Sequence, residues 1–238
     1  MKLIIDIVLL VIIALCTWGG YKKGVVGGVA GILLIIVSLF AGALFSNAYS
    51  SEAIPAFRPF VSGYMDSQDN RSEILEKIGY GDTDRSLTDI LNADPSLRYD
   101  YAYECMQKLG FYDTQSEQLA IEVVQLADSR GMTISDAVVQ VQCETITYVM
   151  GLTIGFLLTL IIISAIGNLL NLSFRLPNME TLDEIGGAVL GFIKALFYCA
   201  LLSWVLSFLG LLIGKETLEG TTLARFFLAF KFITGFLL

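Results

Sequence analysis

Four long apolar stretches are the feature of this 238-residue chain that most constrains its fold. They cover residues 3–20, 24–46, 145–174 and 185–214. Asp6 and Lys194 are the only acidic or basic side chains inside them. A helix needs about 20 mostly apolar residues to cross the hydrocarbon core of a bilayer. A chain of this length carries too little polar surface to enclose four such helices in a soluble core, so the sequence predicts four membrane-spanning helices.

Most acidic residues lie between the second and third stretches. Residues 47–145 hold 17 of the 23 acids and 7 of the 15 bases, which gives this segment a net charge of −10. A segment this polar belongs in water, so we expect one membrane unit that carries a large acidic insertion. The net charge of the whole chain is −8, which makes it a poor electrostatic partner for nucleic acid.

Helix start and stop signals recur through the insertion. Ser86 precedes Asp89, and Thr133 precedes Asp136, at the spacing of a capping box. Gly131 stands where the helix before it would end, because glycine adopts the left-handed conformation common just after a helix. The insertion is therefore expected to be helical.

Other helix boundaries in the insertion follow from the same kind of signal. Asn70 is expected to open a helix over residues 72–78, and Thr114 is expected to open another. A further helix starts near Ile134 and finds no stop signal before the third apolar stretch, so it is expected to run about 35 residues. Residues 53–59 contain two prolines and are expected to form a turn at the membrane surface.

The Lys/Arg bias of short loops predicts the orientation in the membrane. Lys22 and Lys23 occupy the tight turn between the first two stretches, which places that turn in the cytoplasm. The N-terminus and the acidic insertion are then outside. The predicted fold class is all-α: an integral membrane four-helix bundle with a helical extracytoplasmic insertion and a C-terminal amphipathic helix. The predicted segments are 1–46, 47–145, 146–214 and 215–238.

The C-terminal tail combines several phenylalanines with Arg225 and Lys231. A helix over residues 221–238 that lies in the membrane interface fits this pattern, because both charged groups would then reach water. A re-entrant hairpin and an imperfect fifth span stay open as alternatives.

Glycines recur four residues apart within the predicted spans, which is the spacing that lets membrane helices approach closely. They serve either packing within the chain or a contact between copies in a homo-oligomer. The glycines concerned are Gly24, Gly28, Gly31, Gly151, Gly155, Gly187 and Gly191.

Polar side chains inside the predicted spans are candidate functional residues. They are Asp6, Lys194, Asn168 and Asn171. A charged group in hydrocarbon is costly and is usually kept for a reason. One interpretation is anchoring and packing, and the other is a polar pathway or a proton-linked site. A direct pair between Asp6 and Lys194 is awkward in the predicted topology.

The chain contains no histidine, which removes Ser-His and Cys-His nucleophile pairs and histidine metal ligands. Its acids are scattered and do not form paired carboxylates or a calcium loop. We therefore expect no catalytic, cofactor or metal site. Of the four cysteines, Cys105 and Cys143 fall in the insertion, where a disulfide is one alternative.

Short motifs at both ends of the chain carry a family resemblance. They comprise Asp6, Lys23, Gly24 and Gly28 near the N-terminus, and Leu182, Asp183, Gly187, Gly191 and Lys194 around the fourth stretch. The chain resembles the colicin V production protein (CvpA) family in these motifs. The similarity covers roughly residues 1–46 and 145–238. The chain departs from the family's pattern at Glu184, where the family has arginine.

The resemblance implies an integral protein of the bacterial cytoplasmic membrane, associated with production or export of the peptide toxin colicin V and with envelope homeostasis. Our hypothesis is a non-enzymatic scaffold in the lipid bilayer, with the acidic insertion as its contact surface for secretion or envelope proteins. A small channel or transporter, with Asp6 and Lys194 in a polar pathway, is the alternative. A membrane sensor whose insertion binds a ligand is a weaker one.

Overall fold

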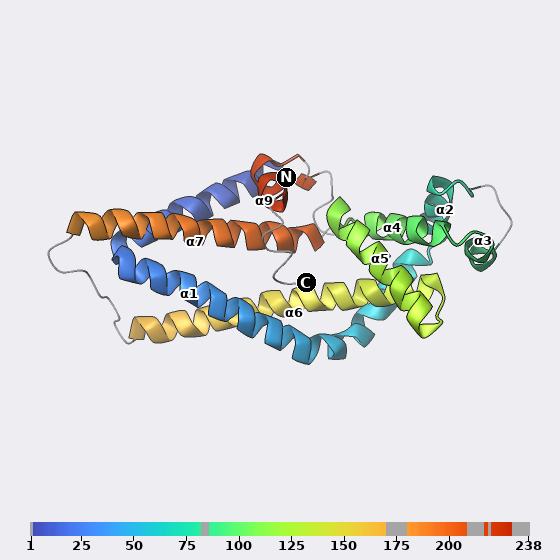
Figure 1. The fold of residues 1–238 in the computed structure, drawn as a ribbon, viewed down its shortest axis with the longest axis horizontal. Helices are drawn as coiled ribbons and strands as arrows, with labels where there is room; N and C mark the ends of the chain where they lie inside the picture. The colour runs from blue at the N-terminus through green and yellow to red at the C-terminus, as the bar shows by residue number, and fades with distance from the viewer. Residues whose placement is uncertain (1, 82–85, 170–179, 209–216, 219, 230–238) are drawn as a thin grey trace. The chain divides into compact units, whose positions relative to one another are not determined.

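The computed structural model describes residues 2–81, 86–169, 180–208, 217–218 and 220–229. Within this part of the chain every regular element is a helix, which confirms the predicted all-α class (Figure 1). The helices are α1 (Lys2–Met65), α2 (Gln68–Lys77), α3 (Leu87–Ala93), α4 (Leu97–Lys108), α5 (Asp113–Arg130), α6 (Ile134–Leu169), α7 (Glu180–Phe208) and α9 (Thr222–Ala229).

The chain divides into two compact units. The first, which we term the apolar unit, comprises Met1–Ala48, Met150–Leu206 and Glu216–Leu238. The second, the acidic unit, comprises Tyr49–Val149 and Ser207–Lys215. Helices α2 to α5 fall in the acidic unit and α9 falls in the apolar unit.

Three helical segments among the described residues are long and apolar enough to cross a membrane: Leu3–Met65, Ile134–Gly167 and Glu180–Phe208. The first of them holds two predicted spans, because α1 is broken at Gly24, where φ is 72° and ψ is −177°. Glycine adopts a positive φ at little cost. The residues before and after Gly24 form two helical arms, and Figure 1 shows them meeting at a sharp bend.

The predicted turn at residues 53–59 is wrong, because α1 continues as helix through Pro55 and Pro59. A proline inside a helix costs about 3 kcal/mol, whereas burying one large apolar side chain contributes roughly 1.5–3 kcal/mol. Here three buried and three partly buried side chains of α1 and α6 pack together, and this packing offsets the cost of the prolines. This cluster consists of Ile54, Phe57, Val61, Val139, Cys143 and Ile146.

Two of the predicted helix N-caps, Ser86 and Thr133, are confirmed. The Ser86 hydroxyl accepts a hydrogen bond from the Asp89 N–H at 3.2 Å and donates one to the Asp89 carboxylate at 2.7 Å. Thr133 and Asp136 make the same reciprocal pair at 3.1 and 2.7 Å, and α6 begins directly after Thr133. Helix α5 ends at Gly131, whose φ of 62° is left-handed as predicted.

Two predicted helix starts are displaced. Helix α2 begins at Gln68, ahead of Asn70, whose amide side chain donates to the Tyr64 carbonyl at 2.7 Å. Helix α5 begins at Asp113, and the Thr114 hydroxyl donates to a glutamine side chain instead of capping the helix. The prediction of one long helix from Ile134 is confirmed, since α6 runs 36 residues.

The acidic unit has an apolar core of its own, which lies largely on α4, α5 and the first part of α6. Its fully buried side chains include Ile74, Ala102, Cys105, Met106, Phe111, Ala120, Val123, Ala137, Val138 and Val141.

Candidate functional site

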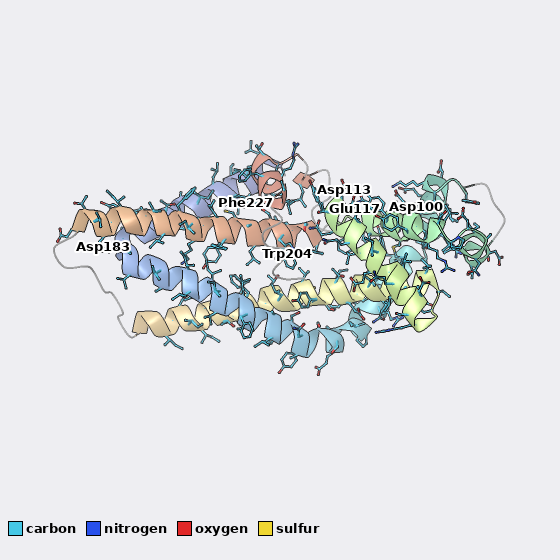
Figure 2. All side chains as sticks on the ribbon, viewed as in Figure 1. Asp100, Asp113, Glu117, Asp183, Trp204 and Phe227 are labelled. Carbon is cyan, nitrogen blue, oxygen red and sulfur yellow. The ribbon has the colours of Figure 1, made fainter. Side chains whose placement is uncertain are left out.

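A side chain from α7 holds the bend of α1. The second arm of α1 starts at Val25, and the first N–H groups of a helix have no acceptor within it. Asp183 Oδ1 accepts a hydrogen bond from the Val25 N–H at 2.8 Å. The Asp183 side chain lies at the bend in Figure 2, and the residue is only 3% exposed. A carboxylate at this position satisfies the N–H and is stabilised by the positive end of the helix dipole.

Aromatic and charged side chains gather beside the bend. The Tyr21 hydroxyl donates to Glu184 Oε2 at 2.8 Å, which gives α1 a second link to the first turns of α7. Lys22 Nζ lies 4.7 Å from the centre of the Trp18 ring, and the Trp18 side chain is largely exposed. Tyrosine, tryptophan and lysine are typical of the boundary between a membrane and water.

Glycines lie at the close approaches between helices of the apolar unit. A Cβ atom at Gly20 would stand 2.7 Å from Gly191 Cα, and one at Gly28 would stand 2.6 Å from Leu190 Cβ. Both distances are too short for a side chain, so α1 meets the backbone of α7 at Gly20 and packs directly on the Leu190 side chain at Gly28. A Cβ added at each glycine predicted to pack would stand within 4 Å of an atom of another helical segment: Gly24, Gly28, Gly31, Gly151, Gly155, Gly187 and Gly191.

Asp6 caps the C-terminal helix. Its Oδ1 accepts a hydrogen bond from the Leu223 N–H at 3.0 Å, and its Oδ2 accepts one from the Thr222 N–H at 3.3 Å. Both N–H groups belong to the first turn of α9. The carboxylate therefore joins the first helix of the chain to α9.

Lys194 lies among different neighbours. It is half-buried, and its Nζ is 5.4 Å from the centre of the Tyr198 ring. Its stem passes close to Gly31, where an added Cβ would stand 3.2 Å from Lys194 Cδ. Asp6 and Lys194 thus contact separate groups, and no ion pair joins these two described residues.

The other two predicted polar residues are Asn168 and Asn171. The side chain of Asn168 and the whole of Asn171 lie outside the described residues. Two serines are also buried in the apolar unit. The hydroxyls of Ser38 on α1 and Ser203 on α7 are fully buried and have no hydrogen-bond partner within the described part of the chain.

The acidic unit presents carboxylates beside an aromatic pair. The rings of Tyr99 and Tyr103 stack on α4 with centroids 6.3 Å apart. The Tyr103 hydroxyl donates to Asp113 at 3.3 Å, and burial together with this carboxylate raises the pKa of Tyr103 to about 12. Burial and the charges of Glu117 and Asp100 also raise the pKa of Tyr99. Figure 2 labels these three acids on the neighbouring helices α4 and α5.

Ion pairs within the acidic unit neutralise other carboxylates. Lys77 lies 3.1 Å from Glu104, Arg98 lies 3.2 Å from Asp128, and Lys108 pairs with Glu73. The ion pair with Lys108 is the main cause that lowers the pKa of Glu73.

Cys105 and Cys143 are both buried in the acidic unit, and their thiols are free in the structure. The disulfide that the sequence leaves open as one alternative stays a prediction. Burial raises the pKa of Cys105 to about 12, which leaves it protonated at neutral pH. Among the residues with described positions, no group of three or more cysteine, aspartate or glutamate side chains is placed to hold a metal ion.

The similarity to known proteins covers most of α5 together with α6, α7 and α9. Residues 118–231 match the family described as colicin V production protein. The predicted resemblance to this CvpA family is confirmed over that range. The match differs in extent from the prediction, because it includes part of the insertion and does not reach residues 1–46. No curated protein and no solved structure matches the chain. The matched domain and the long apolar helices together indicate a CvpA-like membrane protein.

Asp183 is the main residue that the sequence analysis did not predict as a site. The sequence did carry a signal for Asp183, because this aspartate stands with Glu180 in the first turn of an apolar helix, within the short Leu182-Asp183 motif. Its partner, Val25, is 158 residues away, so the sequence spacing could not reveal the contact. Gly20 and Gly42, which also lie at close approaches, were missed as well.

Proposed function

We propose that the protein is a non-enzymatic membrane scaffold that supports production or secretion of a colicin V-like peptide toxin and envelope homeostasis. The match to the family described as colicin V production protein supports the link to toxin production. The scaffold role rests on one observation: buried or partly buried carboxylates of the apolar unit cap helices. Asp183 caps the second arm of α1, and Asp6 caps α9. Groups used in this way give the bundle a fixed geometry on which other proteins can assemble.

The acidic unit is the proposed contact surface of the scaffold. Asp100 and Glu117 are exposed on neighbouring helices next to the stacked tyrosines. Opposite charges on two partners steer their association, so this surface favours secretion or envelope proteins with basic faces. The proposed location is the bacterial cytoplasmic membrane, with the N-terminus and the acidic unit outside.

A deletion strain complemented with variants tests the scaffold proposal. We expect the deletion to lower export of a colicin V-like peptide and survival under envelope stress, and wild-type protein to restore both. Asp100→Lys combined with Glu117→Lys should fail to complement at a normal protein level, because the charge of the contact surface is reversed. The matched control is Gln118→Lys, which places one added charge at another exposed position of α5. A deletion that changes neither readout contradicts the proposal.

The proposed orientation is tested by labelling a new cysteine in intact cells. Both native cysteines of the acidic unit are buried, so a reagent would not reach them. Gln118→Cys, in a chain whose own cysteines are replaced, gives an exposed thiol on α5. A membrane-impermeant maleimide should label it without lysis. Labelling only after lysis would place the acidic unit in the cytoplasm.

One observation favours the alternative of a small channel or transporter. Lys194 is half-buried in the apolar unit and has no ion-pair partner among the described residues. Transport through a pathway that uses Lys194 and Asp6 predicts that Lys194→Gln and Asp6→Asn each abolish flux at normal expression. A scaffold predicts altered stability or no change in either variant.

A further inference from the structure

Two large side chains with apolar surface are exposed on α4 and α5, and one carboxylate lies near both. They are Tyr99 and Ile121, which are 37% and 49% exposed. Ile121 follows Glu117 by four residues, so the two side chains are neighbours on the surface of α5. Burial and the charges of Glu117 and Asp100 raise the pKa of Tyr99, so the Glu117 carboxylate also lies near the Tyr99 ring.

A second tyrosine fixes the position of the Tyr99 ring. The rings of Tyr99 and Tyr103 stack with their centroids 6.3 Å apart and their planes 18° apart. The Tyr103 hydroxyl donates to Asp113 Oδ1 at 3.3 Å, and the Gln107 side-chain amide donates to the same oxygen at 2.9 Å. A ring held in this way binds a ligand at little further cost in side-chain entropy.

The carboxylates beside Tyr99 are not neutralised within the described part of the acidic unit. The ion pairs between described residues use three other acids: Glu73, Glu104 and Asp128. Asp100 and Glu117 are both exposed and belong to none of these pairs. Figure 2 labels them on the neighbouring helices α4 and α5. Their charges favour a cation as the group that contacts the Tyr99 ring.

We infer that the surface formed by Tyr99, Glu117 and Ile121 binds an arginine-bearing segment of a partner polypeptide. A guanidinium group is planar, so it stacks on an aromatic ring while its N–H groups pair with a carboxylate. A lysine ammonium group is a compact charge without this planar fork. The exposed Ile121 side chain suits an apolar residue next to the arginine. The inference rests on the proposed contact surface of the scaffold and names the side chain that the partner presents to it.

Peptide binding by the purified full-length protein in neutral detergent tests this surface. The probes are two short labelled peptides, one that alternates arginine with alanine and one that alternates lysine with alanine. Fluorescence anisotropy at a fixed ionic strength measures the dissociation constant of each peptide. We expect the arginine peptide to bind several-fold more tightly, because only the guanidinium group can stack on Tyr99 and make paired hydrogen bonds with a carboxylate.

Variants separate the aromatic contact from the charge. Tyr99→Ala should weaken binding of the arginine peptide about two- to fivefold, which is the range of an exposed cation–π contact. Tyr99→Phe should retain binding, because it keeps the ring. Glu117→Gln should weaken binding by a similar factor. The matched control is Glu76→Gln, which removes one acid at an exposed position of α2 and should leave binding unchanged.

Ile121→Ser tests the apolar part of the surface and should weaken binding of both peptides. Equal affinities for the two peptides, or equal effects of Glu117→Gln and Glu76→Gln, would mean attraction by net charge alone and would overturn the inference. The scaffold proposal fails separately, if the deletion strain keeps normal export while the purified protein still prefers the arginine peptide. If the deletion lowers export but Tyr99→Ala binds the arginine peptide as the wild type does, the scaffold stands and this surface is refuted.

Discussion

Replacing Asp183 by alanine tests the central contact of the apolar unit. The substitution removes the acceptor of the Val25 N–H, and with it the cap of the second arm of α1. It leaves Gly24 in its left-handed conformation without the contact that holds the bend. The variant should therefore lose stability at one defined point while the rest of the packing is kept.

The size of the loss follows from the burial of the contact. Exchanging a good N-terminal cap for alanine costs about 0.5–2 kcal/mol. A buried N–H left without a partner costs about 1–3 kcal/mol. Asp183 is 3% exposed, so water cannot readily replace it, and we expect a loss of about 2 kcal/mol. For a protein of this size that lowers the unfolding midpoint by about 4–8 °C.

Thermal unfolding of the purified protein in detergent, followed by circular dichroism, measures this loss. Asp183→Asn keeps an acceptor oxygen but loses the charge at the helix end, so it should cost about 0.5–1 kcal/mol. Glu184→Ala is the matched control, since Glu184 is the next residue and accepts its hydrogen bond from Tyr21 at an exposed position. The comparison must resolve a difference of about 1 °C between unfolding midpoints. If the midpoints of Asp183→Ala and Glu184→Ala differ by less than about 1 °C, the reasoning is refuted.

Three other contacts give predictions of their own. Gly20→Leu should cost about 1–3 kcal/mol through overpacking against Gly191, whereas Gly19→Leu, with open space around its Cβ, should not. Asp6→Ala should cost about 1 kcal/mol and speed hydrogen exchange in α9, and unchanged exchange would contradict the cap. Because burial raises the pKa of Cys105 from 9.0 to about 12, its stabilising effect is full below pH 9 and is lost as the pH rises through 12. Between pH 9 and pH 12, the urea midpoint of unfolding should fall less steeply with pH for Cys105→Ala than for the wild-type protein.

Features governed by neighbouring residues could be predicted from the sequence. The reciprocal bonds of Ser86 with Asp89, and of Thr133 with Asp136, depend on groups three residues apart. Gly131 ends α5 because its own backbone can adopt a positive φ. Such interactions are encoded within one turn of helix, so a local pattern was sufficient.

Features governed by distant residues could not be predicted. The prolines at positions 55 and 59 signalled a turn, but a cluster with α6 keeps that segment helical. Asp6 was predicted either to anchor and pack its helix or to belong to a polar pathway, and the N–H groups that it caps lie more than 200 residues away on α9. Asp183 likewise meets Val25 only after the helices have packed. In each case the deciding partner comes from another helix, and its distance along the chain carries no signal.

The ionisable groups of the apolar unit are stabilised in two different ways. A carboxylate that caps a helix end is satisfied by the fold itself, so Asp6 and Asp183 need nothing from outside the protein. An ammonium group has no corresponding acceptor at a helix N-terminus, because the dipole there is positive. Lys194 lies in the interior of α7, where the backbone carbonyls already accept hydrogen bonds from the helix. Its ammonium group lies instead 5.4 Å from the centre of the Tyr198 ring, so the favourable contact that the fold provides for this cation is the negative face of an aromatic ring.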